Sequence, residues 1–296
     1  MTVLPPGAYT ALVTPFSPDG NAVDWQAYER LIDGQLEARV TGLVPCGTTG
    51  ESPTLSEAEQ RELIARAVKL SRGRATVVAG IGSNSTKKTI DSARSALEAG
   101  ADGVMAVMPY YNKPSQDGLF AHVKALSDAV SCPVMLYNIP GRCAVDLSVD
   151  TLLRILEACP NVVALKDASG GVLYTQELLL KSSRSLLVLA GDDALTLPLM
   201  AVGARGVISV TSNLYPRAVS EVVEDALAGR SVEAAAKNKR LYAVHRAMFV
   251  EPNPQPIKAA LALKGRMNAS VRLPLVEASQ SVKGMLADVI QTFEAQ

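Results

Sequence analysis

The sequence predicts a (β/α)8 barrel, the TIM-barrel class of α/β fold, followed by a C-terminal helical extension. Short apolar segments recur as far as Val210, and segments of helical periodicity lie between them. Eight strands that alternate with helices are typical of a closed parallel barrel, which usually takes ~250 residues. An open, doubly wound sheet is the competing fold, but the near-even strand spacing without a topological break favours the barrel.

The eight predicted strands follow the short apolar runs at residues 8–16, 42–45, 76–79, 103–108, 133–137, 162–165, 186–189 and 206–210. Helical periodicity is clearest at residues 56–70, 85–99 and 119–129. Because the last strand ends at Val210, we assign residues 1–230 to the barrel and residues 231–296 to the extension. The helices of that extension should be broken at residues 252–254, Pro-Asn-Pro, and at Pro274.

Composition excludes several classes of function. The chain has 296 residues, of which 48% are hydrophobic, and its 29 basic side chains balance 29 acidic ones, so nucleic acid is not an expected partner. No uncharged apolar run approaches the ~20 residues that span a bilayer, and residues 1–6 lack the basic and apolar parts of a signal peptide. We therefore expect a soluble, cytoplasmic protein without a membrane partner.

The cysteines and histidines do not indicate a metal site. Cys46, Cys132, Cys143 and Cys159 form no CxxC pair, and the only histidines are His122 and His245. We expect reduced thiols, no metal and no cofactor. Residues 80–84, Gly-Ile-Gly-Ser-Asn, are a weak dinucleotide signal because the third glycine of the fingerprint is missing.

Lys166 is the first candidate for catalysis. It follows the apolar run 162–165 directly and precedes residues 167–170, Asp-Ala-Ser-Gly, which places its amine at a strand-to-loop junction. Burial disfavours the ammonium form, so such a lysine can attack a carbonyl carbon and form a Schiff base. A lysine that only extends from a strand end to water is the alternative interpretation.

Polar residues follow other predicted strands at the same end. Residues 47–51, Gly-Thr-Thr-Gly-Glu, combine glycines, two hydroxyls and free amides, which suits a cradle for a small carboxylate, although such turns are also common structurally. Tyr111 and Tyr137 are candidates for proton transfer, and Arg142 is a candidate for binding a second carboxylate. Taken singly, a packed tyrosine or a solvated arginine would be the ordinary interpretation.

The order of these motifs resembles that of the dihydrodipicolinate synthase family, within the N-acetylneuraminate lyase superfamily of Schiff-base enzymes. The resemblance covers nearly the whole chain, and the Thr-Thr pair together with Arg142 favours this family over its sugar-acid relatives. It is carried by residues 14–16, 47–52, 109–112, 137–142, 166–170, 191–193, 206–209 and 251–254. Where many relatives have Arg-Thr-Gly, this chain has Arg142, Cys143 and Ala144.

The resemblance implies a function and site residues. It implies that the Lys166 amine condenses with pyruvate and that the product then adds to aspartate semialdehyde, forming 4-hydroxy-tetrahydrodipicolinate for lysine and diaminopimelate biosynthesis. Thr49 would bind the pyruvate carboxylate and Arg142 the carboxylate of the aldehyde. The resemblance further assigns proton transfer to Tyr137, Thr48 and a neighbouring subunit's Tyr111, and substrate binding to Gly191 and Ile208. It implies a homotetramer built as a dimer of dimers.

Two alternatives remain open at this point. A pyruvate-dependent sugar-acid aldolase, of the keto-deoxy acid or N-acetylneuraminate lyase type, would use the same lysine but accept a longer polyol aldehyde. A non-catalytic binding relative is disfavoured because the lysine, both tyrosines and the arginine are all present.

The resemblance also bears on feedback inhibition. Lysine-sensitive relatives bind the amino acid with a glutamate and histidines at a dimer interface. Here the corresponding residues are Lys88, Glu57 and Gln60, whereas Ser52, Asn84 and Tyr110 match. A cation at position 88 repels the ammonium groups of lysine, so we expect weak or absent inhibition.

Overall fold

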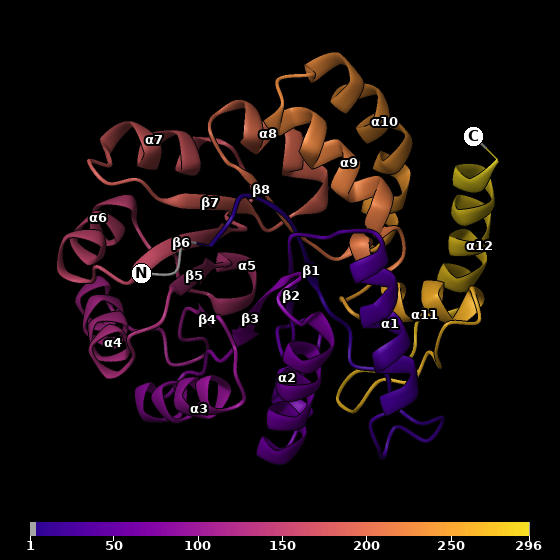
Figure 1. The fold of residues 1–296 in the computed structure, drawn as a ribbon, viewed down its shortest axis with the longest axis horizontal. Helices are drawn as coiled ribbons and strands as arrows, with labels where there is room; N and C mark the ends of the chain where they lie inside the picture. Colours follow the sequence, from indigo (N-terminus) through magenta and orange to yellow (C-terminus); the bar gives the residue numbers. More distant parts are fainter. Residues whose placement is uncertain (1–3, 296) are drawn as a thin grey trace.

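The computed structural model describes residues 4–295; the first three residues of the N-terminal segment considered above and residue 296 lie outside that range. Eight parallel strands close into a barrel in sequence order, with β1 pairing to both β2 and β8. This confirms the predicted (β/α)8 fold (Figure 1). The strands are β1 (Gly7–Ala11), β2 (Gly42–Val44), β3 (Thr76–Gly80), β4 (Gly103–Val107), β5 (Val134–Asn138), β6 (Val162–Asp167), β7 (Leu187–Ala190) and β8 (Gly206–Ser209).

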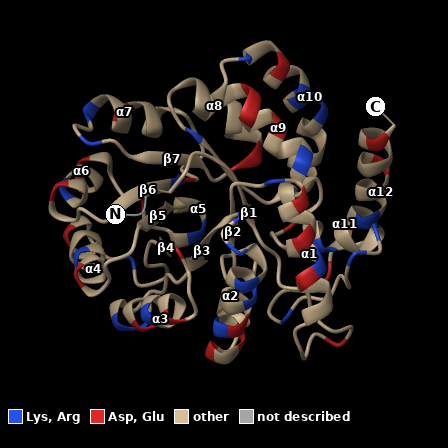
Figure 2. Cartoon of the chain, viewed as in Figure 1, with Lys and Arg blue, Asp and Glu red and all other residues tan. Residues whose placement is uncertain are grey.

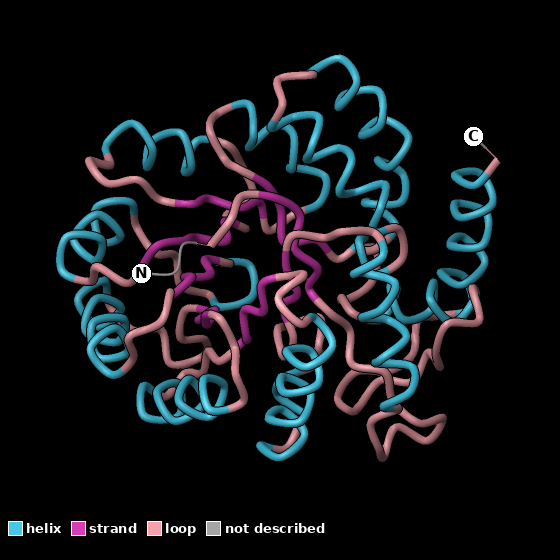
Figure 3. The backbone as a smooth tube through the Cα atoms, in the orientation of Figure 1, coloured by secondary structure: helices cyan, strands magenta, loops and turns pink. Residues whose placement is uncertain are grey.

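The helices surround this barrel and continue beyond it. The α-helices are α1 (Trp25–Glu37), α2 (Glu57–Ser71), α3 (Thr86–Glu98), α4 (Gln116–Ala129), α5 (Pro140–Cys143), α6 (Val149–Ala158), α7 (Leu173–Lys181), α8 (Thr196–Ala201), α9 (Pro216–Leu227), α10 (Ser231–Ala247), α11 (Gln255–Leu263) and α12 (Gln280–Glu294). Short 3-10 turns are η1 (Ser52–Thr54), η2 (Asp193–Leu195) and η3 (Thr211–Asn213). Figure 3 shows the ring of strands inside the helices, and charged residues lie mostly on the helices and loops around it (Figure 2).

Serine residues form the N-caps of several helices. Ser56 caps α2 in a capping box with Glu59, and Ser85, Ser115 and Ser148 accept hydrogen bonds from the first turns of α3, α4 and α6. The helix predicted from residue 119 begins at Gln116, because its first turn is polar and only the Ser115 cap marks it.

The first predicted strand was too long. The sheet ends at Ala11, and residues 12–16 leave it as an irregular segment although they are apolar and buried. Their polar groups bond elsewhere: the Val13 amide donates to Asn213 Oδ1 at 3.1 Å, and the Thr14 hydroxyl donates to the Gly50 carbonyl at 2.7 Å. An apolar run shows burial, but it does not show which partner takes the backbone hydrogen bonds. The last strand ends one residue early for the same reason, since the Val210 amide donates to Asp193.

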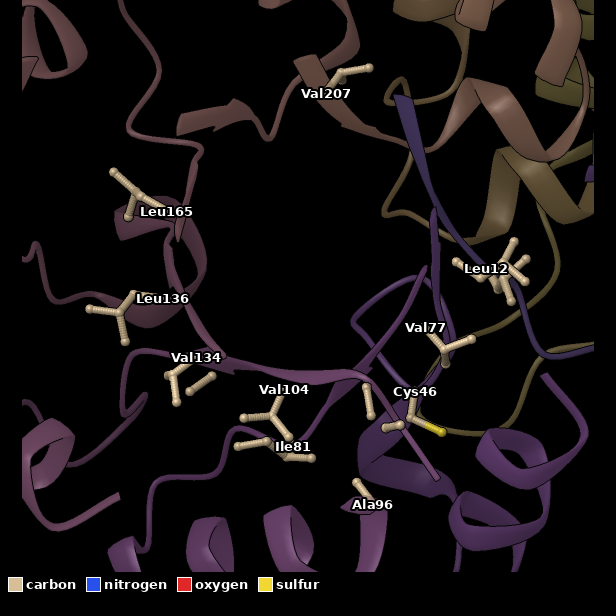
Figure 4. Close-up of a cluster of buried hydrophobic side chains, with 14 of the residues drawn as sticks. Leu12, Cys46, Val77, Ile81, Ala96, Val104, Val134, Leu136, Leu165 and Val207 are labelled. Atoms are coloured by element: carbon tan, nitrogen blue, oxygen red, sulfur yellow. The ribbon is translucent and has the colours of Figure 1, made fainter. Parts of the chain in front are cut away.

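The main hydrophobic core lies between the strands and the helices. In Figure 4, Leu136, Val134, Leu165 and Val104 point away from the barrel axis toward the helix layer. Alternate strand residues point inward and fill the barrel, among them Tyr9, Met105, Met135, Ala164 and Leu189. This alternation decides which residues of each strand end can reach the mouth of the barrel.

Helices α10, α11 and α12 lie between Ser231 and Glu294 and form the predicted C-terminal helical extension. They share a second core with the barrel, which joins Val13, Val210 and Leu214 to Val244, Ile257 and Leu286. The breaks fall where proline predicted them, after α10 at Pro252 and before α12 at Pro274. We keep Arg230, the residue before α10, as the proposed boundary between barrel and extension.

Candidate active site

Lys166 and Tyr137 lie side by side inside the barrel. They are paired in register on neighbouring strands, β6 and β5, and Nζ of Lys166 lies 4.1 Å from the centre of the Tyr137 ring. Both side chains point inward, whereas Leu165 packs in the outer core. Strand β6 extends two residues beyond its predicted end, so Lys166 belongs to the strand and has a fixed backbone.

The Lys166 amine is buried, and its pKa is low. The side chain is 5% exposed, and burial lowers the pKa from its ordinary value of 10.5 to about 8. The Asp193 carboxylate opposes this shift, and the Arg142 guanidinium adds to it. Among residues 4–295, no side chain forms an ion pair or hydrogen bond with this Nζ. A buried amine without a partner and with a low pKa suits nucleophilic attack on a carbonyl.

Asp167 fixes the loop that follows Lys166. Its carboxylate is buried and accepts hydrogen bonds from the Ser169 amide at 2.8 Å and the Thr175 hydroxyl at 2.5 Å. Since adjacent strand residues point to opposite faces, Asp167 can anchor helix α7 while Lys166 faces the barrel interior. Of these two adjacent residues, Lys166 is thus the candidate reactive group and Asp167 is the structural one.

Tyr137 lies beside this amine on the neighbouring strand. Burial raises the pKa of the Tyr137 phenol far above its usual value, while the nearby Arg142 guanidinium and Thr48 hydroxyl act in the opposite direction. The phenol therefore keeps its proton at neutral pH. A protonated hydroxyl beside the amine and Thr48 is suited to donating and accepting a proton during a reaction.

The loop after β2 carries the residues of the predicted carboxylate cradle. Thr49 is buried, and its hydroxyl oxygen accepts a hydrogen bond from Asn253 Nδ2 at 2.9 Å. The amides of Gly50 and Glu51 are taken within the loop, but in the part of the chain that the structure describes those of Thr48 and Thr49 have no partner. Two free amides beside two hydroxyls suit a carboxylate, and its binding here stays a prediction.

Arg142 lies on α5 at the rim of the site. The residue is exposed, and its Nη2 donates to the Asn253 carbonyl at 3.1 Å. The unusual residues beside it keep the turn: the Cys143 thiol donates to the Met108 carbonyl at 3.3 Å, and Ala144 adopts a left-handed conformation with φ 55°. Alanine in this conformation costs about 1 kcal/mol relative to glycine. The turn is nevertheless kept, since the Ala144 amide still donates to the Pro140 carbonyl at the end of α5.

Tyr111 is not brought into the site of its own chain. Its side chain is 87% exposed, and its backbone has φ 74°, an uncommon value for an aromatic residue. Other residues in the loops after β2 and β4 share this strain: Cys46, Glu51 and Lys113 also have positive φ. Such strain is often found at functional sites.

Gly191 and Ile208 lie at the ends of β7 and β8. A side chain at Gly191 would meet the Ala168 Cβ at 2.8 Å, and its amide donates to the Asp167 carbonyl at 2.7 Å, so packing alone requires glycine. Ile208 is fully buried inside the barrel. The structure therefore places both residues near the mouth, and their binding of substrate stays a prediction.

The sequence pattern did not single out Asp193, His245 or Asn253. Asp193 is 1% exposed, accepts hydrogen bonds from Ser209 and the Val210 amide, and influences the pKa of Lys166. His245 lies 3.8 Å from Asp193 and bonds through Nδ1 to the Thr211 hydroxyl at 2.9 Å. The motifs at 191–193 and 251–254, which carry the family resemblance, contain Asp193 and Asn253 but gave neither residue a role, and nothing in the sequence of α10 marked His245.

A buried ion pair holds the loop at residues 47–51 in place. Lys258 on α11 contacts Glu51 with Nζ 2.5 Å from Oε1, and the same Nζ donates to the Ser270 carbonyl at 2.7 Å. The Arg272 amide donates to the other Glu51 oxygen at 2.9 Å. The extension is thereby attached to the loop that carries Thr48 and Thr49.

Residues 4–295 contain no cluster of three or more His, Cys, Asp or Glu side chains able to hold a metal ion. Within the same range, no helix combines the length and the hydrophobicity needed to cross a membrane.

Fold and site together define a (β/α)8-barrel enzyme. Residues 5–293 match the model of the Dihydrodipicolinate synthetase family, and the chain belongs to that family. It is 57% identical to a 4-hydroxy-tetrahydrodipicolinate synthase of Sorangium cellulosum over 98% of this chain and 96% of that protein.

Solved structures of the family have the same fold. The 4-hydroxy-tetrahydrodipicolinate synthase of Methylacidiphilum fumariolicum SolV superposes with a TM-score of 0.96 at 43% identity, covering 98% of this chain and 96% of that one. The chloride-inhibited dihydrodipicolinate synthase of Acinetobacter baumannii, solved in complex with pyruvate, gives a TM-score of 0.95 at 39% identity, with 98% and 99% covered.

Proposed function

We propose that this enzyme condenses pyruvate with aspartate semialdehyde and forms 4-hydroxy-tetrahydrodipicolinate, a step of lysine and diaminopimelate biosynthesis. The observation that carries the proposal is the buried, unpaired Lys166 amine, whose pKa is about 8, next to the protonated phenol of Tyr137. Its support is the 57% identity to a relative named for this activity and the pyruvate complex of a solved relative.

In the proposed mechanism, Nζ of Lys166 adds to the keto carbon of pyruvate, and water leaves with the former carbonyl oxygen. The resulting imine loses a methyl proton and becomes an enamine, whose carbon attacks the aldehyde carbon of aspartate semialdehyde. The amine of that substrate then displaces Lys166 as the ring closes, which restores the free lysine. Burial favours the first step because it keeps part of the amine neutral near neutral pH.

The surrounding residues have separate roles in this mechanism. Thr49 and the free amides of its loop bind the pyruvate carboxylate, and Arg142 at the rim binds the carboxylate of the aldehyde. Tyr137 and Thr48 transfer protons at the imine. Gly191 and Ile208 shape the pocket wall.

Tyr111 completes the relay of a neighbouring subunit. Its 87% exposed ring and strained backbone present the phenol outward from its own chain, which supports a dimer in which each protomer lends this residue to the other. We propose that two such dimers form a homotetramer and that the enzyme works in the cytoplasm.

Mixing two inactive variants tests the shared site. Tyr111→Phe and Lys166→Met subunits, dissociated and reassembled together, should recover about a quarter of the normal activity, since half the dimers are hybrids with one complete site each. No recovery above that of the separate variants, in mixtures whose hybrid dimers are demonstrated by mass, would place Tyr111 in the site of its own chain.

A substrate comparison tests the activity itself. The purified enzyme should consume pyruvate and aspartate semialdehyde in equal amounts and should not cleave keto-deoxy sugar acids or N-acetylneuraminate. Cleavage of a sugar acid with little use of aspartate semialdehyde would favour the aldolase alternative instead.

A further inference from the structure

Asn253 connects the C-terminal extension to two parts of the site. It lies between α10 and α11 and is 6% exposed. Its side-chain Nδ2 donates to the Thr49 hydroxyl oxygen at 2.9 Å, and its main-chain carbonyl accepts a hydrogen bond from Arg142 at 3.1 Å. One residue therefore contacts the cradle with its side chain and the arginine with its backbone.

The side-chain contact restricts the direction in which the Thr49 hydroxyl can donate its hydrogen. A hydroxyl has one hydrogen to donate and two lone pairs that accept. Because the Asn253 amide donates to Thr49 Oγ1, the Thr49 hydrogen cannot be directed at that amide. Among the described residues, 4–295, no acceptor takes this hydrogen. It is therefore available to a carboxylate that enters the cradle.

We propose that Asn253 is a positioning residue for the keto-acid substrate: it holds the Thr49 hydroxyl as a hydrogen-bond donor toward the substrate carboxylate. This inference rests on the proposed function, because it takes the cradle at residues 47–51 as the pyruvate site. Asn253 acts through Thr49.

The surroundings of Asn253 favour a role in the site over a role in stability. Its second side-chain atom, Oδ1, is buried without a hydrogen-bond partner. A buried acceptor without a partner destabilises a fold, so a smaller apolar side chain at this position removes one favourable and one unfavourable interaction together. The ion pair between Lys258 and Glu51 independently holds the same two segments together. The fold therefore does not depend on the Asn253 amide.

Borohydride trapping of pyruvate at different pyruvate concentrations tests the proposal. Asn253→Ala should raise the half-saturating pyruvate concentration about tenfold, as expected for the loss of one well-oriented hydrogen bond to a charged ligand. The KM for aspartate semialdehyde should change by less than about twofold, since the carbonyl that holds Arg142 belongs to the backbone and remains. The melting temperature should stay within about 3 °C.

Asn268→Ala is the matched control. Asn268 belongs to the same C-terminal extension but lies between α11 and α12, and its Nδ2 donates to the Phe16 carbonyl at 3.3 Å and not to the cradle. This variant should trap pyruvate with the normal concentration dependence. An equal rise in both asparagine variants would show a general loosening of the C-terminal extension and overturn the proposal.

A double-mutant cycle with Thr49→Val separates positioning from other effects. If Asn253 acts through the Thr49 hydroxyl, Asn253→Ala should change the half-saturating concentration by less than about twofold once that hydroxyl is gone. The proposal would be contradicted if the two substitutions raised the half-saturating pyruvate concentration by independent factors that multiply in the double variant. Normal trapping by Asn253→Ala alone would also contradict it. Absence of trapping in the unchanged enzyme would instead contradict the proposed function and remove the basis of this inference with it.

Discussion

Two buried lysines of this chain lie in contrasting environments. Lys166 and Lys258 are both nearly inaccessible to solvent, and burial lowers the pKa of each from 10.5 to about 8. Lys258 is held by the Glu51 carboxylate and the Ser270 carbonyl, whereas the Lys166 amine has an aromatic ring beside it and no paired carboxylate among residues 4–295. Burial is thus common to both, and the partner decides whether the amine is structural or reactive.

The surroundings of Lys258 bind two distant parts of the chain together. Glu51 also accepts the Arg272 amide, and the Lys258 and Arg272 cations each lie within 4.3 Å of the centre of the Phe16 ring. A buried pair of this kind is strongly destabilising when one partner is removed, because the other charge stays buried. Lys166 forms no ion pair within residues 4–295, so its removal breaks none, and the nearby Asp193 carboxylate keeps its own hydrogen bonds to Ser209 and the Val210 amide.

Substituting methionine at each position should separate the two roles. Lys166→Met keeps the volume of the side chain but removes the nucleophile, so turnover should fall by at least about five orders of magnitude. Its free energy of unfolding should be unchanged or higher, because a buried amine with a lowered pKa destabilises the fold at neutral pH. Steady-state rates and urea denaturation measure the two effects.

Lys258→Met should have the opposite profile. Loss of one partner from the buried pair should lower the free energy of unfolding by about 3–5 kcal/mol, while Lys166 still traps pyruvate in the folded fraction. Adding Glu51→Gln should recover part of the stability, because the remaining buried charge is removed. A stable, inactive Lys258→Met or an unstable, active Lys166→Met would reverse the comparison.

Tyr137→Phe tests the aromatic neighbour of the reactive lysine. The ring stays in place, but the hydroxyl that transfers protons is lost, so turnover should fall by about two to four orders of magnitude. Tyr28→Phe is a suitable control, since that buried hydroxyl donates to the Leu63 carbonyl far from the amine. Near-normal turnover of Tyr137→Phe would give this tyrosine a packing role only.

The rate of pyruvate trapping should depend on pH with an inflection near 8. The folded-state pKa of Lys166 lies below its ordinary 10.5, so the neutral, nucleophilic amine increases as pH rises through about 8 and the rate levels off above it. Arg142→Gln removes a charge that lowers this pKa and should move the inflection upward. Asp193→Asn removes a charge that raises it and should move the inflection downward. An inflection near 10 in the unchanged enzyme would mean that the amine is solvated.

The smallest expected effect concerns lysine as an inhibitor. Ser52, Glu57, Gln60, Lys88 and Tyr110 line one cavity of about 390 Å³ beside α2 and α3. With the Lys88 cation in its wall, we predict that submillimolar lysine leaves the activity unchanged.

Lys88→Glu should increase sensitivity to lysine. Lys87→Glu, on the same helix but outside this cavity, should not do so. Inhibition of the unchanged enzyme at submillimolar lysine would show that Glu57 supplies the missing charge.

Much of the architecture could be predicted from the sequence because burial and periodicity determine it. The eight strands were found near their observed places, and Lys166 was recognised as a strand-end amine because one cation follows an apolar run. The ends of strands were less predictable: at residues 12–16 and at Val210 side chains distant in sequence take the backbone hydrogen bonds.

The supporting residues of the site could not be predicted in the same way. Asn253 reaches Thr49 across 204 residues, and Lys258 reaches Glu51 across 207. Neither contact leaves a local pattern, since Asn253 sits in a helix break and Lys258 resembles an ordinary helix-surface lysine. Long-range polar contacts of this kind become visible only when the extension is packed against the barrel.

The central claim is that the unpaired buried amine, and not the paired one, is the nucleophile. Incubation with pyruvate and borohydride, followed by peptide mass spectrometry, tests this directly. We predict one reduced pyruvate adduct per chain, located on Lys166, with no adduct on Lys258 and none in Lys166→Met. A stoichiometric adduct on Lys258 or another lysine, or normal turnover without any adduct, would contradict the account.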